Sequence, residues 1–339
     1  MVRELASAFS PTGPVLILST RFDVATDSVV AQLATIGTEA VRVNTEDFPF
    51  DTRISIDLPA GAVDGEFALH DIRTDGACRP RSVWMRRLRL PPLLDGMEQG
   101  AYEFAAREAR SALLGMGFIS GAPTMNPTAE GWAAENKVYQ LSVASDVGLD
   151  VPPTVITNSP DRVRRAFNDY QGQMVVKAVR SGYAELDRGP VAVYTRQVLD
   201  EHLASIESVR LAPSIYQPLL RKRTDVRVTI VGDRLWAAEI HSQSDPHAAI
   251  DWRRTERPDL LHTVLALPEG VSRGLMALMR RLGLVFGAID LVRTPEDRFV
   301  FLEVNPSGQW LWLESSLEFP ISRSIADWLT RPGVAGLNR

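Results

Sequence analysis

Residues 285–306 read VFGAIDLVRTPEDRFVFLEVNP, two apolar runs separated by a turn signal. Val285–Val292 and Phe299–Val304 are rich in β-branched and aromatic residues, and Pro295–Asp297 is typical of a turn. We therefore predict a hairpin of two strands. Asp290 interrupts the first strand, and Glu303 and Asn305 end the second, so the hairpin would bring three oxygen-bearing side chains together.

Carboxylate and amide oxygens are the ligands that magnesium prefers, and nucleotide phosphates often supply the remaining positions. An apolar strand such as Phe301–Val304 does not accept a carboxylate without a partner, because burying an unpaired charge is unfavourable. We therefore predict a metal site formed by Asp290, Glu303 and Asn305. The alternative is that Asp290 and Glu303 are solvent-facing charges of an exposed hairpin.

A second hairpin precedes this one, with strands at Asp225–Val231 and Arg234–Ile240 joined by a Gly-Asp turn. At the other end of the chain, a strand at 15–19, a helix at 27–36 and a strand at 40–43 predict a β-α-β opening. Hydrophobic periodicity predicts further strands at 53–58, 66–70, 82–87, 154–157, 174–179, 191–195 and 214–219, and helices at 100–114, 131–147, 159–170, 196–208 and 270–282.

The proline-rich segment Pro123–Pro127 is typical of a domain boundary. We expect three units, an N-terminal domain at 1–126, a central lobe at 127–213 and a C-terminal lobe at 214–339, and an α/β fold class whose lobes are of α+β type.

The composition excludes several classes of protein. The 339 residues are 45% apolar and 23% charged with a net charge of −5, so bulk positive charge does not recruit nucleic acid. The single cysteine, Cys78, rules out a disulfide within the chain and a multi-cysteine metal site. No run approaches the roughly 18 apolar residues of a membrane span. We expect a cytoplasmic protein that binds neither membrane nor nucleic acid.

Lysine is unusually rare in this chain. Of the 37 basic residues only three are lysine, which leaves 37 − 3 = 34 arginines; the lysines are Lys137, Lys177 and Lys222. Lysine carries a compact ammonium whereas arginine carries a planar fork, so lysine would be kept where a compact charge is needed. The alternative is that three surface lysines remained by chance.

Five segments, in this order and spacing, resemble the ATP-grasp fold over residues 127–330: Val176-Lys177, Tyr216–Leu220, Asp225–Arg227, Gly287–Asp290 and Phe301–Pro306. The resemblance implies that ATP lies between two α+β lobes. It also implies that Lys137 and Lys177 contact phosphates, and that the hinge facing adenine consists of Gln217, Pro218, Leu219 and Leu220. The loop 180–189, with Ser181 and Gly182, would close over the phosphates; an ordinary hairpin loop is the alternative.

Further segments are similar to the microviridin-type peptide ligases, or graspetide synthetases, across nearly the whole chain: Trp84–Arg87, Asn136–Gln140, Glu239–Gln243, Asp251–Arg254 and Asn305–Gln309. The resemblance implies an N-terminal pre-ATP-grasp-like domain, the cofactors ATP and Mg2+, a homodimer, and a ribosomal precursor peptide as partner, with a leader and an acidic, Thr-rich core. Such enzymes activate Asp or Glu carboxylates as acyl phosphates and form esters with Thr or Ser, or amides with Lys.

Several residues keep two interpretations. Arg227 would act at the acyl phosphate or substrate carboxylate together with Lys177 and the metal ligands, or would only pair with Asp225. Arg253 and Arg254 would bind acidic residues of the peptide or lie in an exposed loop. The remaining residues of this kind are His241, as a base or a simple hydrogen-bonding side chain, and Trp84, Arg86 and Arg87, which would face the active site or pack within the first domain.

Two other functions remain open at this point. One is an ATP-grasp ligase that joins free amino acids or extends peptide tails, because the same nucleotide machinery serves many acceptors. The other is a non-catalytic nucleotide- or peptide-binding protein, which the intact set of charged residues argues against.

Overall fold

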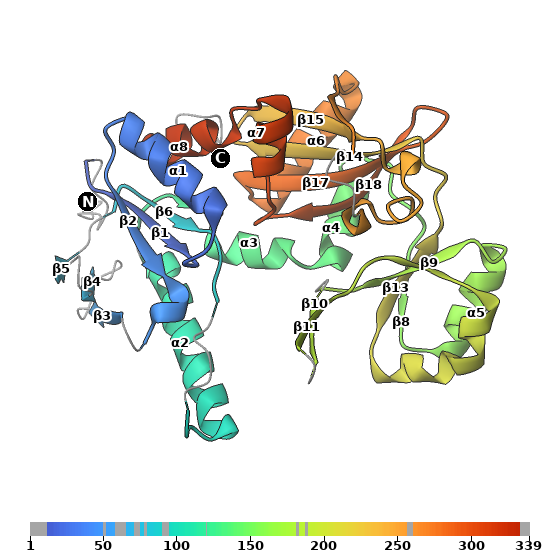
Figure 1. The fold of residues 1–339 in the computed structure, drawn as a ribbon, viewed down its shortest axis with the longest axis horizontal. Helices are drawn as coiled ribbons and strands as arrows, with labels where there is room; N and C mark the ends of the chain where they lie inside the picture. Colours follow the sequence, from blue (N-terminus) through green and yellow to red (C-terminus); the bar gives the residue numbers. More distant parts are fainter. Residues whose placement is uncertain are drawn as a thin grey trace, which may run out of the picture.

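The computed structural model describes residues 12–49, 52–57, 66–70, 75–77, 80–89, 95–119, 121–180, 183–186, 189–255 and 260–332. Figure 1 shows an N-terminal sheet, a long C-terminal sheet and a smaller lobe arranged along the longest axis. The predicted α/β fold class with an N-terminal β-α-β unit is confirmed. Among the described residues, no helix combines the length and apolar character that crossing a membrane requires.

The N-terminal sheet is parallel, with the strand order β2-β1-β6-β7. Its strands are β1 (Val15–Ser19), β2 (Ala40–Asn44), β6 (Ser82–Met85) and β7 (Thr124–Met125). All five residues of β1 are buried, as a central parallel strand requires. Helix α1 (Val24–Thr35) begins earlier than predicted because the Asp23 carboxylate caps it, accepting from Ala25 N.

Helix α2 (Gln99–Ile119) also belongs to this region, as does an antiparallel sheet of β3 (Arg53–Asp57), β4 (Glu66–His70) and β5 (Asp75–Ala77). Two helices that we did not predict follow the final hairpin, α7 (Leu311–Leu317) and α8 (Ile321–Thr330). Ile321, Ile325 and Leu329 recur every four residues on α8 and join the core formed by β1 and α1. The end of the chain thus completes the core of its beginning.

The smaller lobe is an antiparallel sheet with the order β12-β9-β13-β8. It comprises β8 (Val155–Thr157), β9 (Met174–Ala178), β12 (Arg196–Val198) and β13 (Ser214–Pro218), covered by α5 (Pro160–Asp169) and a 3₁₀ helix at Asp200–Leu211. The predicted helix at 196–208 is wrong at its start, because 196–198 pairs with β9, whereas the rest is the 3₁₀ helix, kinked at Ser205. The predicted strand at 191–195 is β11 (Gly189–Ala192), which pairs with β10 (Tyr183–Leu186).

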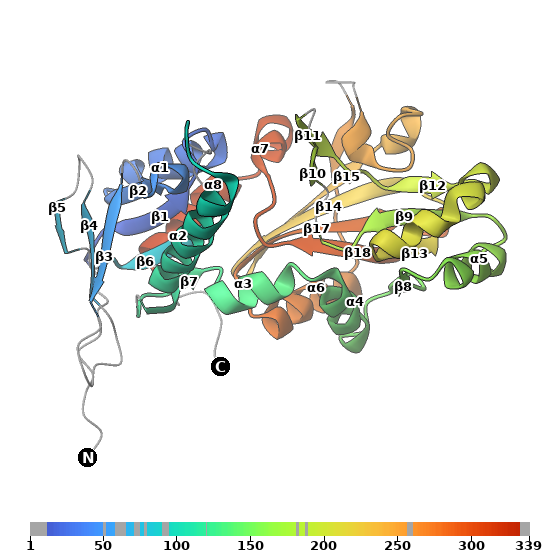
Figure 2. The same ribbon diagram turned by 90° about the horizontal axis from the view of Figure 1, so that it is seen from below.

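The C-terminal sheet is antiparallel, with the order β16-β15-β14-β17-β18. Its strands are β14 (Thr224–Val231), β15 (Arg234–Ile240), β16 (His262–Val264), β17 (Phe286–Arg293) and β18 (Phe299–Asn305). Both predicted hairpins are confirmed. Helices α4 (Lys137–Asp146) and α6 (Glu269–Leu282) cover one face of this sheet (Figure 2).

The helix predicted at 131–147 is two helices, α3 (Thr128–Ala134) and α4. The break has a local cause: the Asn136 side chain accepts hydrogen bonds from Val138 N and Tyr139 N, which caps a new helix and places Lys137 at its first position.

Asn126 joins the N-terminal region to the C-terminal sheet. Its side chain is buried, and its Oδ1 accepts from Val285 N and Phe286 N, both at 2.7 Å. Its Nδ2 donates to Phe286 O at 2.8 Å and to Pro306 O at 3.1 Å. One amide therefore satisfies four backbone groups where β17 begins and where the segment after β18 turns.

We predict that Asn126→Ala lowers the free energy of unfolding by about 2–4 kcal/mol, because it leaves buried backbone groups without partners. Urea denaturation measures this change. Asn158→Ala is the control, since Asn158 is exposed and its amide donates only a long bond, 3.5 Å, to Arg210 O. Equal shifts for the two variants would contradict the assignment.

Candidate active site

Three charged residues lie in one row across the C-terminal sheet. Arg227 on β14 is opposite Asp290 on β17, which is opposite Glu303 on β18. Arg227 Nε donates to Asp290 Oδ1 at 2.9 Å, and Nη2 approaches Oδ2 at 3.4 Å. Arg227 therefore pairs with Asp290 and not with Asp225.

A β-bulge on β18 makes this row possible. Ile289 pairs with Val304 and Leu291 with Phe301, so the two core residues of β18 are three positions apart, an odd spacing that a regular strand does not allow on one face. The register shifts between Asp290 and Leu291, which gives β18 one extra residue. Glu303 can therefore lie opposite Asp290 while both neighbouring pairs stay in the core.

β18 is the edge strand of its sheet, and it is held by a side chain of α4 and by the backbone of the segment that follows α4. The Gln140 amide donates to Val304 O at 2.8 Å and accepts from Val304 N at 3.0 Å. Phe301 N donates to Asp150 O at 2.7 Å. Sequence reasoning gave no role to Gln140, although a buried glutamine one helical turn after a capping asparagine was a signal of one.

All three lysines line one cleft of about 680 Å³ between β9, β13 and the C-terminal sheet. Lys137 Nζ lies 2.8 Å from Glu303 Oε2. Lys222 donates to Asp225 Oδ1 at 2.9 Å and to Ile250 O at 2.8 Å. Within the described part of the chain, Lys177 has no carboxylate within 4 Å. Lys222 was no site prediction, yet the scarcity of lysine pointed to it.

The predicted hinge residues Gln217, Pro218, Leu219 and Leu220 line the same cleft. The Gln217 side chain donates to Thr154 Oγ1 at 2.9 Å, and Leu219 N donates to Gln173 O at 2.8 Å. Apolar lining comes from Val175, Val292 and Leu302. A cleft with apolar walls and a few converging cations has the character of a nucleotide site.

A loop brings Asp251, Trp252 and Arg253 over the cleft. Arg253 forms a two-pronged bond with Asp251, at 2.8 and 2.7 Å, and its Nη1 lies 3.9 Å from Glu303 Oε1. The Arg227 guanidinium lies 5.3 Å from the Trp252 ring centroid. Arg254 does not line this cleft, and His241 Nε2 bonds Thr263 Oγ1 at 3.1 Å outside it.

The charged side chains of the cleft shift one another's pKa values. Burial, together with the neighbouring Glu303, raises the pKa of Asp290 despite the opposing effect of Arg227. Burial alone would raise the pKa of Glu303, but Lys137, Arg253 and Lys177 outweigh it and the pKa is lowered. Burial lowers the pKa of Lys177 to about 8, with Lys137 and Lys222 adding to the effect and Glu303 opposing it.

The oxygen set fits a magnesium ion bound together with phosphates. Asp290 and Glu303 face each other across paired strands, and Asn305 follows two residues after Glu303, its Oδ1 accepting from Ser307 N at 2.9 Å. Among the described residues, no group of three or more His, Cys, Asp or Glu side chains is suitable for a metal. Two carboxylates and an amide suit magnesium, because a protein usually supplies only a few of its ligands and water and phosphate oxygens complete the coordination.

Two predicted residues, Ser181 and Gly182, lie outside the described residues. Next to them, Arg180 Nη2 lies 2.8 Å from Glu135 Oε2 on the segment between α3 and α4.

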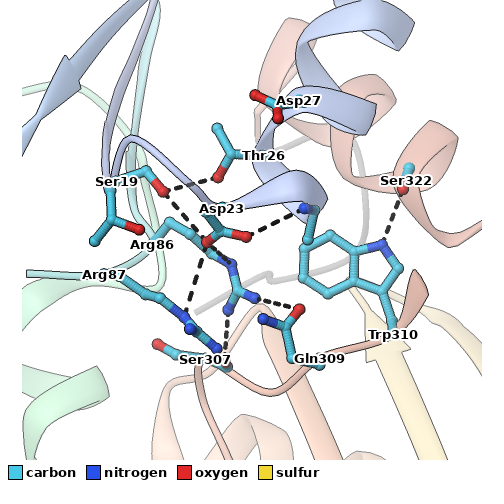
Figure 3. A network of polar contacts seen from close by, with 12 residues as sticks. Ser19, Asp23, Thr26, Asp27, Arg86, Arg87, Ser307, Gln309, Trp310 and Ser322 are labelled. Atoms are coloured by element: carbon cyan, nitrogen blue, oxygen red, sulfur yellow. Dashed lines mark hydrogen bonds and ion pairs between the residues drawn. The ribbon is translucent and has the colours of Figure 1, made fainter. Parts of the chain in front are cut away.

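A buried network joins the N-terminal region to the segment after Asn305 (Figure 3). Arg86 is 1% exposed; its Nε lies 3.3 Å from Asp23 Oδ2, and its guanidinium donates to Ser307 O and to Gln309 Oε1. Burial lowers the pKa of Arg86 to about 10, with Asp23 opposing and Arg87 adding to the shift. Trp84 packs in the core, so of the Trp84, Arg86 and Arg87 cluster only Arg87 is exposed.

Comparisons with known proteins agree with this arrangement. Residues 14–128 match the family model of the MvdD pre-ATP grasp domain. Macrocyclase MdnC from Microcystis aeruginosa MRC, solved with precursor peptide MdnA, is 28% identical, with a TM-score of 0.83 and coverage of 93% of this chain and 99% of that chain. A RiPP-associated ATP-grasp ligase from Chryseobacterium gregarium, solved with ADP and a leader and core peptide, is 26% identical, with a TM-score of 0.85 and coverage of 94% and 96%.

Macrocyclase MdnB from Microcystis aeruginosa MRC is 30% identical over 94% of this chain and 99% of that chain, with a TM-score of 0.78. The chain therefore belongs to the ATP-grasp macrocyclases, the graspetide synthetases, which are ATP-dependent ligases that form rings in ribosomal precursor peptides.

Proposed function

We propose that this ligase activates Asp or Glu side chains of a short ribosomal precursor peptide and joins them to Thr or Ser hydroxyls, or to Lys amines. The observation that carries the proposal is the row of Arg227, Asp290 and Glu303, which ends in the cleft that the three lysines line. The relatives MdnC, solved with its precursor peptide, and the Chryseobacterium ligase, solved with leader and core peptides, support a peptide partner.

In this proposal ATP occupies the lysine-lined cleft, with adenine beside Gln217–Leu220 and the phosphates beside Lys137 and Lys177. Lys137 is the first residue of α4, so its ammonium adds to the positive end of a helix dipole. The backbone and hydroxyl donors of Ser181 and Gly182 would cover the phosphates. Asp290, Glu303 and Asn305 would hold Mg2+, which supplies positive charge next to the phosphates when bound.

The overall reaction removes one water molecule from the peptide for each bond formed. A peptide carboxylate oxygen bonds to the γ-phosphorus of ATP and ADP leaves, giving an acyl phosphate. The hydroxyl or amine then attacks the acyl carbon, gives up its proton, and inorganic phosphate leaves. Arg227, held by Asp290 and 8% exposed, would stabilise the charge that develops on the acyl group. Arg253, held by Asp251, would orient the same carboxylate.

The assembly and location belong to the same proposal. The family likeness leads us to propose a homodimer, which light scattering of the purified protein tests. Use of ATP and of a ribosomal peptide leads us to propose the cytoplasm as the site of the reaction.

A ligase for free amino acids remains the second candidate, because the nucleotide site does not depend on the acceptor. The two differ in product mass. Incubation with Mg-ATP and a short acidic, Thr-containing peptide yields losses of about 18 Da per ring for a macrocyclase, whereas incubation with Mg-ATP, the peptide and free amino acids adds the mass of one residue for the other ligase.

We predict that Glu303→Gln reduces the rate of water loss from the peptide by about 10²-fold or more, because it removes a charge from the metal site. Mass spectrometry of timed reactions measures the rate. Glu269→Gln on α6, whose side chain is 84% exposed, is the matched control and should leave the rate unchanged. Normal water loss by the Glu303 variant would sink the role proposed for Glu303, and absence of water loss in wild type and variant alike would support the non-catalytic alternative.

We predict that Mg-ATP binds less tightly above pH 8. The Lys177 ammonium loses its proton as the pH rises through about 8, so the dissociation constant should increase by up to about tenfold per pH unit beyond that point. Titration calorimetry between pH 6.5 and 9.5, on the order of one pH unit below and above the transition, measures the change. Lys177→Arg keeps its charge over this range and should show a flat profile.

The lowered pKa of Lys177 also makes the stability of the fold depend on pH. Because folding lowers the pKa of Lys177, the unfolded chain binds more protons between pH values of about 8 and 10.5, and stability rises with pH across that window.

A pH profile of ATP binding that is identical in wild type and Lys177→Arg would show that this lysine does not contact the phosphates.

A further inference from the structure

A second groove, of about 1170 Å³, lies on the side of the cleft that faces the N-terminal region. We call it the arginine groove. Its walls come from the segment after β6, from α2, from α3 and from the segment after β18; Figure 2 shows α2 and α3 adjoining beside β6 and β7. Its charged lining consists of Arg86, Arg87, Arg89, Arg110, Glu135 and Arg180.

The lining holds five arginines against one glutamate, although the whole chain has a net charge of −5. A local excess of positive charge in an acidic protein concentrates anions at that place. The excess of arginine in its lining therefore suits the groove to binding an anion.

Two of the five arginines already form close ion pairs with carboxylates of the protein. Arg86 is buried against Asp23, and Arg180 pairs with Glu135 at 2.8 Å. Arg87 is 42% exposed, with its Nε 3.8 Å from Asp23 (Figure 3). Within the described ranges, Arg89 and Arg110 have no carboxylate within 4 Å, so their forks are available to a ligand.

The backbone of Arg89 is fixed even though its side chain is exposed. Thr45 Oγ1 accepts from Arg89 N at 2.9 Å and donates to Arg89 O at 3.0 Å. Arg110 is on the 21-residue helix α2. Both guanidinium groups therefore extend from ordered elements, which reduces the entropy lost when they bind a partner.

The arginine groove is continuous with the active site. Pro306, Glu135 and Arg180 line this groove and also the space that contains Lys177 and Glu303. A chain lying in the groove would pass Pro306 and reach the metal ligands. Leu88, Leu114 and Trp132, the last 52% exposed, give the same walls apolar surface.

We propose that the arginine groove binds an acidic segment of the peptide substrate, through Arg89, Arg110 and Arg87, and leads the neighbouring carboxylate past Pro306 to Glu303. This inference rests on the proposed function and adds the path of the substrate. Arginine forks match carboxylates and stay charged at all relevant pH values. The apolar walls favour a peptide over a free polyphosphate, which has no apolar part to bury.

The test uses the full-length enzyme and a fluorescently labelled peptide with a Thr-, Glu- and Asp-containing core. Its analogue carries Gln and Asn in place of Glu and Asp. We expect Arg89→Glu and Arg110→Glu each to weaken binding of the acidic peptide by about tenfold in fluorescence anisotropy, and to remove the preference over the analogue. The KM for ATP should stay as in wild type.

Arg107→Glu is the matched control, since Arg107 is exposed on the same helix and does not line the groove. Arg110→Gln keeps the test usable if charge reversal disturbs folding, and should show a smaller shift in the same direction. The inference is overturned if Arg107→Glu weakens binding equally, if peptide affinity is unchanged, or if the KM for ATP rises instead. Failure of wild type to dehydrate any peptide would overturn the proposed function separately, because anisotropy does not depend on turnover.

Discussion

The β-bulge on β18 is the constraint on which the site depends. Without the extra residue, a strand that keeps Phe301 in the core would direct Glu303 into the core as well, since residues two apart share a face. With it, the hairpin keeps its apolar pairs and still offers a carboxylate opposite Asp290. Bulges are common next to active sites for this reason. The Gln140 amide then fixes the edge strand directly beside Glu303.

The row of charges is possible because each buried carboxylate has a cation of its own. Asp290 pairs with Arg227, and Glu303 pairs with Lys137. Asp251 pairs with Arg253. Asp225 pairs with Lys222 and also accepts a hydrogen bond from the Ser242 hydroxyl. An unpaired carboxylate at such a depth would be unfavourable. Lys177 is the cation for which the described residues provide no direct partner, and burial lowers its pKa, with Lys137 and Lys222 adding to the effect. The resulting surplus of positive charge is what a polyphosphate ligand requires.

The sequence predicted the parts of the fold that local patterns determine. The two C-terminal hairpins alternate or run apolar between clear turns, and the N-terminal β-α-β unit has a buried central strand. The Asp23 cap that starts α1 was not predicted. The sequence did not predict α8, although Ile321, Ile325 and Leu329 recur every four residues there. Local periodicity does not identify the partner of such a helix, and α1 lies about 300 residues earlier in the chain. The break at Asn136 was visible as an N-cap but was outweighed by the continuous periodicity around it. The pairing of Arg227 with Asp290 depends on strand order, which alternation along one strand does not contain.

The two ends of the segment from Asn305 to Trp310 belong to different parts of the molecule. Asn305 ends the strand that carries Glu303, whereas Gln309 and Trp310 contact Arg86, whose guanidinium lies 4.7 Å from the Trp310 ring. Arg86 is itself held by Asp23 at the start of α1. The six residues from Asn305 to Trp310 therefore link the N-terminal region directly to the end of the strand that carries Glu303. The groove that we propose for the peptide and the space that contains Lys177 and Glu303 meet at this segment, because Pro306 lines both.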